Sequence, residues 1–178
     1  MFSLDKMINR CRPGHGASCA LCCGSHNYAA APEEIESIFI DRALDRTKSI
    51  HGHPEESSGK KLFNDAIQCP NVGVSSEDPG IICCLVYDCA ARENAISSFF
   101  NGTCKNFFCA AWDSLTDEEV LFAAELMGDW YYYSLFINDI ESLKEEFSTY
   151  GSPQHVPVSR LAEIKEKLAQ RLIDEDGK

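Results

Sequence analysis

The feature that most constrains this chain is the distribution of its cysteines. Ten Cys occur among 178 residues, and all of them lie between Cys11 and Cys109. This density indicates either disulfides, which belong to secreted domains, or metal and redox chemistry inside cells. The last third of the chain, residues 110–178, has no Cys. We therefore expect a Cys-rich part that carries a site and a second part that supports it.

The compartment decides between these two interpretations of the cysteines. The first ten residues carry charges through a mixed sequence, and no apolar run reaches the length of a signal-peptide core or a membrane span. We expect a cytoplasmic protein, and this location favours metal binding over disulfides.

The charge of the chain limits its partners. Its formal net charge is −12, from 16 Lys and Arg against 28 Asp and Glu. Such a field repels phosphate backbones and anionic lipid surfaces, so we expect neither nucleic acid nor a membrane as a partner. Nothing in the sequence indicates which protein it contacts.

The apolar pattern and the helix-start signals predict a mainly α-helical fold. Pro32, with two glutamates after it, suits the first turn of a helix. Thr116 and Glu119 match a capping box that opens another helix, with a break at Gly128. The elements we expect are helices over residues 32–46, 90–100 and 117–147, a last helix that follows Ser159, and a short strand over residues 81–87.

The length of the chain suits one compact domain and is slightly short for two. We expect residues 1–178 to form a single helical domain with Cys-rich loops around a metal centre. Within it, residues 1–112 would be the metal-binding part and residues 113–178 the helical supporting part.

The strongest local motif is Cys19-Ala-Leu-Cys22-Cys23. A gap of two residues lets two thiolates converge on one ion from a turn, as in zinc and iron–sulfur sites. The adjacent Cys23 does not easily join the same tetrahedron, so it binds a second iron, stays buried or acts as a redox thiol. Six further thiols form two more groups that also favour a metal site: Cys69, Cys83, Cys84 and Cys89, then Cys104 and Cys109.

These motifs resemble a family of zinc- or iron-chelating domains named for a CxxCxxCC motif. The resemblance covers about half of the chain, and its elements are Cys19-Ala-Leu-Cys22-Cys23, Cys69-Pro70, Cys84-Leu-Val-Tyr87 and Cys104-Lys-Asn-Phe107. The family's first Cys falls at Gly16 here, so Cys11 or His15 would take its place. The resemblance implies a metal-binding function with six ligands: Cys19, Cys22, Cys23, Cys69, Cys84 and Cys104.

The identity of the metal and the use of the site stay open. Four thiolates suit zinc or iron–sulfur, and an all-Cys set favours a [4Fe–4S] cluster over Zn²⁺. We expect a binding or electron-transfer module. The alternatives are an enzyme that uses an open position on the metal, and a metal-free thiol redox protein that uses Cys22/Cys23 or Cys83/Cys84. Additional ligands that remain possible are Cys11, His15, Cys83, Cys89 and Cys109.

Overall fold

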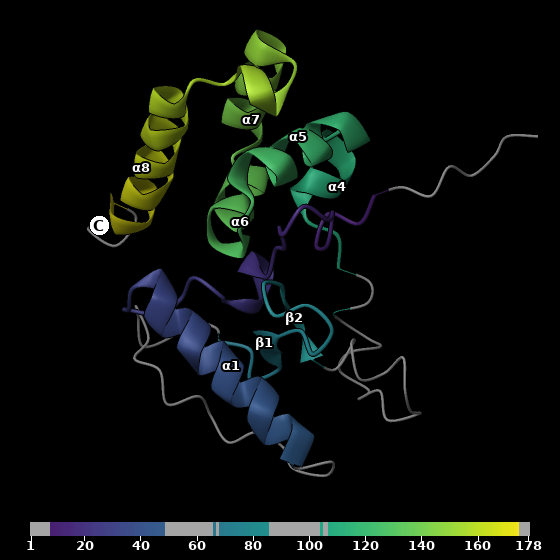
Figure 1. The fold of residues 1–178 in the computed structure, drawn as a ribbon, viewed down its shortest axis with the longest axis vertical. Helices are drawn as coiled ribbons and strands as arrows, with labels where there is room; N and C mark the ends of the chain where they lie inside the picture. The colour runs from purple at the N-terminus through teal and green to yellow at the C-terminus, as the bar shows by residue number, and fades with distance from the viewer. Residues whose placement is uncertain (1–7, 49–65, 67, 86–103, 105–106, 175–178) are drawn as a thin grey trace, which may run out of the picture. The chain divides into compact units, whose positions relative to one another are not determined.

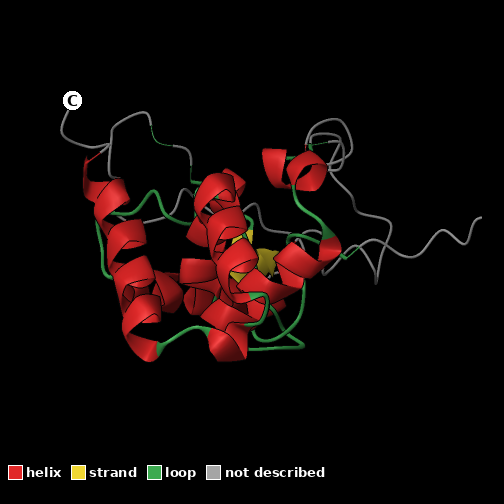
Figure 2. Cartoon of the chain, turned by 90° about the horizontal axis from the view of Figure 1, so that it is seen from above, coloured by secondary structure: helices red, strands yellow, loops and turns green. Residues whose placement is uncertain are grey.

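The computed structural model describes residues 8–48, 66, 68–85, 104 and 107–174. Within them the chain is mainly helical, with six α-helices and one two-stranded sheet (Figures 1 and 2). This confirms the predicted mainly α fold. No helix among these residues is long and apolar enough to cross a membrane.

The chain divides into two compact units. The helical unit consists of Met1–Cys19 and Ala110–Lys178, and the cysteine unit consists of Ala20–Cys109. The sequence placed its division near residue 112 and assigned the N-terminal segment to the Cys-rich part. The expectation of a single domain stays a prediction.

The helical unit contains five α-helices and one 3-10 turn among its described residues: α4 (Ala110–Ser114), α5 (Asp117–Met127), α6 (Trp130–Asn138), α7 (Ile140–Tyr150), η3 (Pro153–His155) and α8 (Val158–Asp174). Its core is apolar. Val120, Tyr133, Phe136 and Leu143 are completely buried, and α8 adds Ile164 and Leu168 to them. The burial of these side chains is the main stabilising term of the unit.

The ends of α5 follow the sequence prediction. Thr116 N–H donates to Glu119 Oε2 over 2.8 Å, and Glu119 N–H donates to Thr116 Oγ1 over 3.3 Å, so the predicted capping box is present. The helix ends at Gly128, whose φ of 64° lies in the left-handed region that Gly adopts without strain. The predicted break at Gly128 is therefore confirmed.

Two expectations about the later helices are wrong. The helix predicted to run to Phe147 is interrupted at Asp139, which caps the end of α6 by donating its backbone N–H to two carbonyl oxygens. The last helix begins at Val158, so Ser159 lies inside its first turn instead of preceding it. The short α4 was not expected, because five residues are too few for a clear apolar period.

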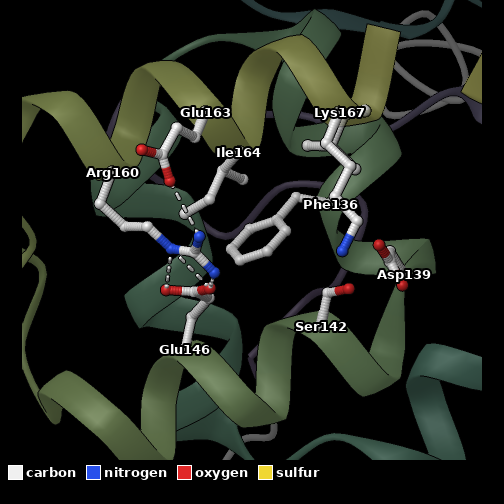
Figure 3. A pocket seen from close by; sticks show the side chains of 9 residues that line it. Phe136, Asp139, Ser142, Glu146, Arg160, Glu163, Ile164 and Lys167 are labelled. Atoms are coloured by element: carbon white, nitrogen blue, oxygen red, sulfur yellow. Dashed lines mark hydrogen bonds and ion pairs between the residues drawn. The ribbon is translucent and has the colours of Figure 1, made fainter. Parts of the chain in front are cut away.

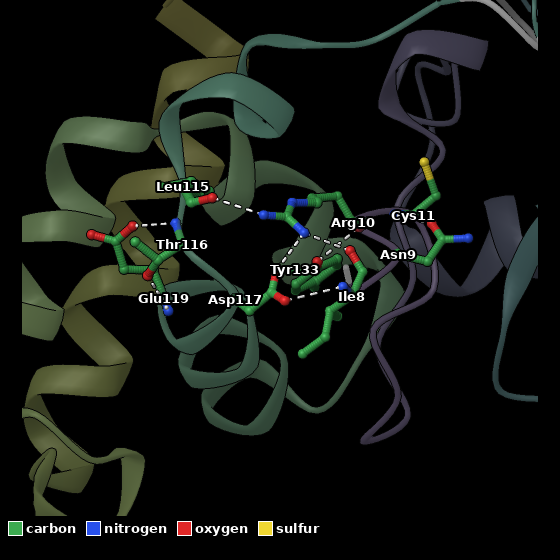
Figure 4. A network of polar contacts seen from close by, with 9 residues as sticks. All are labelled: Ile8, Asn9, Arg10, Cys11, Leu115, Thr116, Asp117, Glu119 and Tyr133. Carbon is green, nitrogen blue, oxygen red and sulfur yellow. Dashed lines mark hydrogen bonds and ion pairs between the residues drawn. The ribbon is translucent and has the colours of Figure 1, made fainter. Parts of the chain in front are cut away.

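A buried arginine attaches the N-terminal segment to the helical unit (Figure 4). Arg10 is 3% exposed and donates to Asp117 Oδ1 over 2.6 Å and to the Leu115 carbonyl over 2.8 Å. Tyr133 Oη donates to the carbonyl of Arg10 over 2.8 Å. Because these bonds satisfy most of a buried charge, breaking them by removing one partner would be costly. They explain why residues 8–19 belong to this unit.

The cysteine unit combines a 3-10 turn, a long helix and a hairpin: η1 (Leu21–Cys23), α1 (Pro32–Lys48), β1 (Val72–Val74) and β2 (Ile82–Cys84). The helix predicted over residues 32–46 is confirmed as α1, and β2 lies within the predicted strand over residues 81–87. The partner strand β1 was not expected. The helix predicted over residues 90–100 falls outside the described residues.

Helix α1 packs against the hairpin at a glycine. Ile35 and Phe39 of α1 are buried. A Cβ at Gly73 of β1 would lie 2.6 Å from Leu85 Cδ1 and 3.1 Å from the Phe39 carbonyl oxygen. Only a residue without a side chain allows the helix backbone to come this close to the strand. This packing sets the position of the hairpin that carries the later cysteines.

Candidate metal centre

Five of the six predicted ligands belong to the cysteine unit. They come from the η1 turn, from the segment before β1, from β2 and from the residues before α4, and they are Cys22, Cys23, Cys69, Cys84 and Cys104. The sixth, Cys19, belongs to the helical unit, where Asn138 Nδ2 lies 3.8 Å from its Sγ.

The η1 turn presents two thiols side by side. Cys23 N–H donates to the Ala20 carbonyl over 3.0 Å and Gly24 N–H donates to the Leu21 carbonyl over 2.9 Å. Gly24, with a φ of 79°, then reverses the chain direction. The sulfur atoms of Cys22 and Cys23 lie 4.0 Å apart.

Backbone hydrogen bonds bring Cys69 and Cys84 to the same region. Cys69 N–H donates to the Cys23 carbonyl over 2.9 Å, which fixes Cys69 beside η1. In the hairpin Val72 faces Cys84, and Leu85 N–H donates to the Asn71 carbonyl over 2.8 Å. Residues far apart in sequence are thereby held within one small part of the cysteine unit.

The ionisation of these thiols is mutually linked. The pKa of Cys23 is raised, first by its hydrogen bond with Cys22, then by burial and by the charges of Cys22, Cys69 and Cys84. The pKa of Cys104 is raised by partial burial and by the charges of Cys69 and Cys22. Like charges disfavour ionisation of a group. Cys23 and Cys104 therefore lie close enough to neighbouring thiols for thiolates there to disfavour their ionisation, and a bound cation would relieve this repulsion.

The pKa of Cys22, in contrast, is lowered. With Cys23 as the donor, the hydrogen bond between the two sulfurs lowers the pKa of Cys22 to about 7, although burial acts in the opposite direction. Cys22 is therefore the thiol of this pair that ionises first.

The donor chemistry of the group fits zinc or iron–sulfur, because soft thiolates select these metals over magnesium or calcium. The positions of the side chains, however, do not form a complete coordination site. Across the described part of the chain, no group of three or more His, Cys, Asp or Glu side chains is placed so that it could hold a metal ion.

The further ligands left open by the sequence lie in different places. Cys11 and His15 are exposed in the helical unit. Cys83 is buried, and because side chains alternate along a strand, it points to the face of β2 opposite Cys84. Cys109 is half-buried in the cysteine unit, and Cys89 falls outside the described residues. His26 is buried, with Nδ1 2.9 Å from Ser25 Oγ.

Sequence reasoning missed Arg42, which connects three parts of the cysteine unit. Its guanidinium donates to the carbonyls of Cys69 and Val72, each over 3.2 Å, and to Tyr28 Oη over 2.6 Å. It also lies 5.4 Å from the centre of the Phe39 ring. A signal was present in the sequence, since Arg42 continues the apolar stripe of α1 at helical spacing from Ile35 and Phe39.

The helical unit contains a small cavity of about 100 Å³ between α6, α7 and α8, lined by both charged and apolar side chains (Figure 3). Arg160 Nε lies 3.1 and 3.3 Å from the two carboxylate oxygens of the buried Glu146. Partial burial acts to raise the pKa of Asp139, but hydrogen bonds from Arg171 and Ser142 outweigh it and hold this pKa below its usual value. These charged groups already pair with one another, so the cavity stabilises the helix packing and does not point to a ligand.

Comparisons of the chain with family models, curated proteins and solved structures found no match. The resemblance to the zinc- or iron-chelating family therefore stays a prediction.

Proposed function

We propose that this protein binds a metal centre through the thiolates of its Cys-rich segments, with a [4Fe–4S] cluster as the first candidate and Zn²⁺ as the second. The ligands would be Cys22, Cys23, Cys69, Cys84 and Cys104 of the cysteine unit, while the role of Cys19, which belongs to the helical unit, stays a prediction. The observation that carries the proposal is the hydrogen bond from Cys69 N–H to the Cys23 carbonyl, because it joins two thiol-bearing segments that are distant in sequence.

The energetics of the clustered thiols support this proposal. Separate segments have lost conformational freedom to bring thiols together, and ionising Cys23 or Cys104 creates repulsion with neighbouring thiolates. A bound cation supplies the missing attraction, and in small metal sites this binding energy contributes directly to folding. The role supported best is a binding or electron-transfer module. The enzyme alternative, the cytoplasmic location and the lack of nucleic-acid and membrane partners stay predictions.

A metal-free thiol redox protein is the second candidate. It is favoured by the 4.0 Å separation of the Cys22 and Cys23 sulfurs and by the lowered pKa of Cys22. It ranks lower, since a disulfide between adjacent residues requires a strained ring. The pair Cys83/Cys84 is less suitable still, because the two side chains point to opposite faces of β2.

Anaerobic purification with elemental analysis and a visible spectrum tests the proposal. Brown protein with a broad visible band, iron and sulfide indicates the cluster, and colourless protein with stoichiometric zinc indicates the zinc site. Fully folded protein without bound metal, which also fails to take up iron with sulfide or zinc, would contradict metal binding and favour the thiol redox function.

Two variants test the ligand assignment. Cys69→Ser removes one predicted ligand, and we expect it to lower the metal content. Cys83→Ala is the matched control, because Cys83 lies beside Cys84 in the same strand but faces the other side. Equal loss of metal in both variants would show that the assignment is wrong.

A further inference from the structure

Arg42 of α1 contacts both the segment after η1 and the segment that carries Cys69. Its partners are two main-chain carbonyls, those of Cys69 and Val72, and the hydroxyl of Tyr28. The side chain is half-buried, and its guanidinium also lies over the rings of Tyr28 and Phe39 at 5.8 and 5.4 Å. These contacts fix both the position and the plane of the guanidinium.

We propose that Arg42 is a positioning residue for the metal centre, which holds the backbone of residues 69–72 so that the Cys69 thiol meets the thiols of η1. This inference rests on the proposed function. A carbonyl oxygen of the ligand residue itself accepts from Arg42, so a change in the guanidinium is transmitted to Cys69 through one residue. Groups that orient metal ligands in this way typically change metal affinity by about 10- to 100-fold when they are replaced.

Arginine is suited to this role by its geometry. Its planar fork carries five donors at fixed angles, whereas lysine carries one compact ammonium group that does not span three acceptors in the same way. Arg42→Lys therefore keeps the positive charge and loses the fork. Tyr28→Phe removes a single acceptor and leaves both bonds to the Cys69 segment, so we expect a smaller effect from it.

The test is a Co²⁺ titration of the full-length chain, followed by the thiolate-to-cobalt absorption band. We expect Arg42→Lys to weaken Co²⁺ binding by about 10- to 100-fold, and to lower the band at saturation toward that of Cys69→Ser. Arg160→Lys, which alters a comparable arginine in the helical unit, should leave both quantities unchanged. If Arg42→Lys does not fold, Tyr28→Phe gives the same comparison with a milder change.

A double-mutant cycle separates positioning from general stabilisation. If Arg42 acts through Cys69, adding Arg42→Lys to Cys69→Ser has no further effect on Co²⁺ affinity. Additive losses, or wild-type affinity in Arg42→Lys, overturn this inference while the metal-binding function stands. A wild-type protein that binds no Co²⁺ and no iron with sulfide overturns the proposed function, and this inference with it.

Discussion

The two units of this protein obtain their order in different ways. The helical unit has a continuous apolar core, with caps at α5 and α6 and buried aromatic rings such as Phe136. The described part of the cysteine unit has strands of three residues and one long helix, with a smaller apolar core that includes Ile35, Phe39 and Val72, and Arg42 also links these parts. Burial stabilises both units, and the proposed function implies that the cysteine unit also depends on the metal that its thiols would bind.

Removing the metal should produce the largest effect and should act on one unit. The proposed function implies that chelation withdraws binding free energy of about 10 kcal/mol from the cysteine unit. Hydrogen exchange measures this residue by residue. We expect the amides of β1, β2 and α1 to lose protection, while those of α5 and α6 keep theirs. Equal loss of protection in both units would remove the distinction between them.

Core truncation in the helical unit should be the next largest effect. Phe136 is completely buried, so Phe136→Ala should lower the free energy of unfolding by about 3–5 kcal/mol. Chemical denaturation followed by far-ultraviolet circular dichroism measures this loss. The exposed Val158 offers a control, since Val158→Ala should change stability by less than about 0.5 kcal/mol. The metal content of Phe136→Ala should be unchanged under conditions in which the variant is folded.

Loss of the α5 cap should have a smaller effect. Thr116→Ala removes the side-chain acceptor for Glu119 N–H and should cost about 1 kcal/mol. Thermal denaturation of the helical unit reports this change. Thr149→Ala is a suitable control, because its hydroxyl bonds to the Glu145 carbonyl within α7 and caps no helix start. A Thr116→Ala variant as stable as the wild type would mean that the other bond of the capping box, from the backbone N–H of residue 116 to the Glu119 carboxylate, is sufficient.

The same contrast explains which parts of the structure were predictable. The start and end of α5 follow from local rules, since Thr116, Glu119 and Gly128 act within one or two turns of the helix. Strand β1 was missed because Val72–Val74 is too short to show a period, and its pairing with Ile82–Cys84 is set by a partner that sequence patterns do not reveal. The break at Asp139 likewise depends on packing of α6 and α7 against shared neighbours.

The candidate site was predictable in composition but not in arrangement. Residue spacing singled out Cys22 and Cys23, because two Cys in one short turn are informative by themselves, whereas Cys69, Cys84 and Cys104 were predicted from the resemblance to the chelating family. Spacing did not place Cys19 with the helical unit, where Arg10 and Tyr133 hold the N-terminal segment through contacts more than a hundred residues apart in sequence. It also missed Arg42, since the carbonyls that it binds belong to a segment that approaches α1 only in the folded chain.

The smallest expected effect is a difference in thiol reactivity between the units. The pKa of Cys22 is lowered to about 7 because Cys23 donates a hydrogen bond to its sulfur. At pH 7 about half of Cys22 is thiolate, and after allowance for the weaker nucleophilicity of a more acidic thiol, it should react about threefold faster than an unperturbed Cys. Iodoacetamide labelling of metal-free protein, read by peptide mass spectrometry, compares Cys22 with the exposed Cys11 of the helical unit.

The pH dependence of this labelling tests whether the lowered pKa of Cys22 causes its higher reactivity. Because the pKa of Cys22 is lowered in the folded state, ionisation of this thiol stabilises the fold above the usual thiol pKa of about 8.5. That contribution is lost as the pH falls through about 7. The labelling rate of Cys22 should therefore rise with a midpoint near pH 7, and Cys23→Ala should move this midpoint upward because the donor is gone. A midpoint that stays in place in Cys23→Ala would assign the shift to another group, and Cys83→Ala controls for the loss of a thiol elsewhere in the cysteine unit.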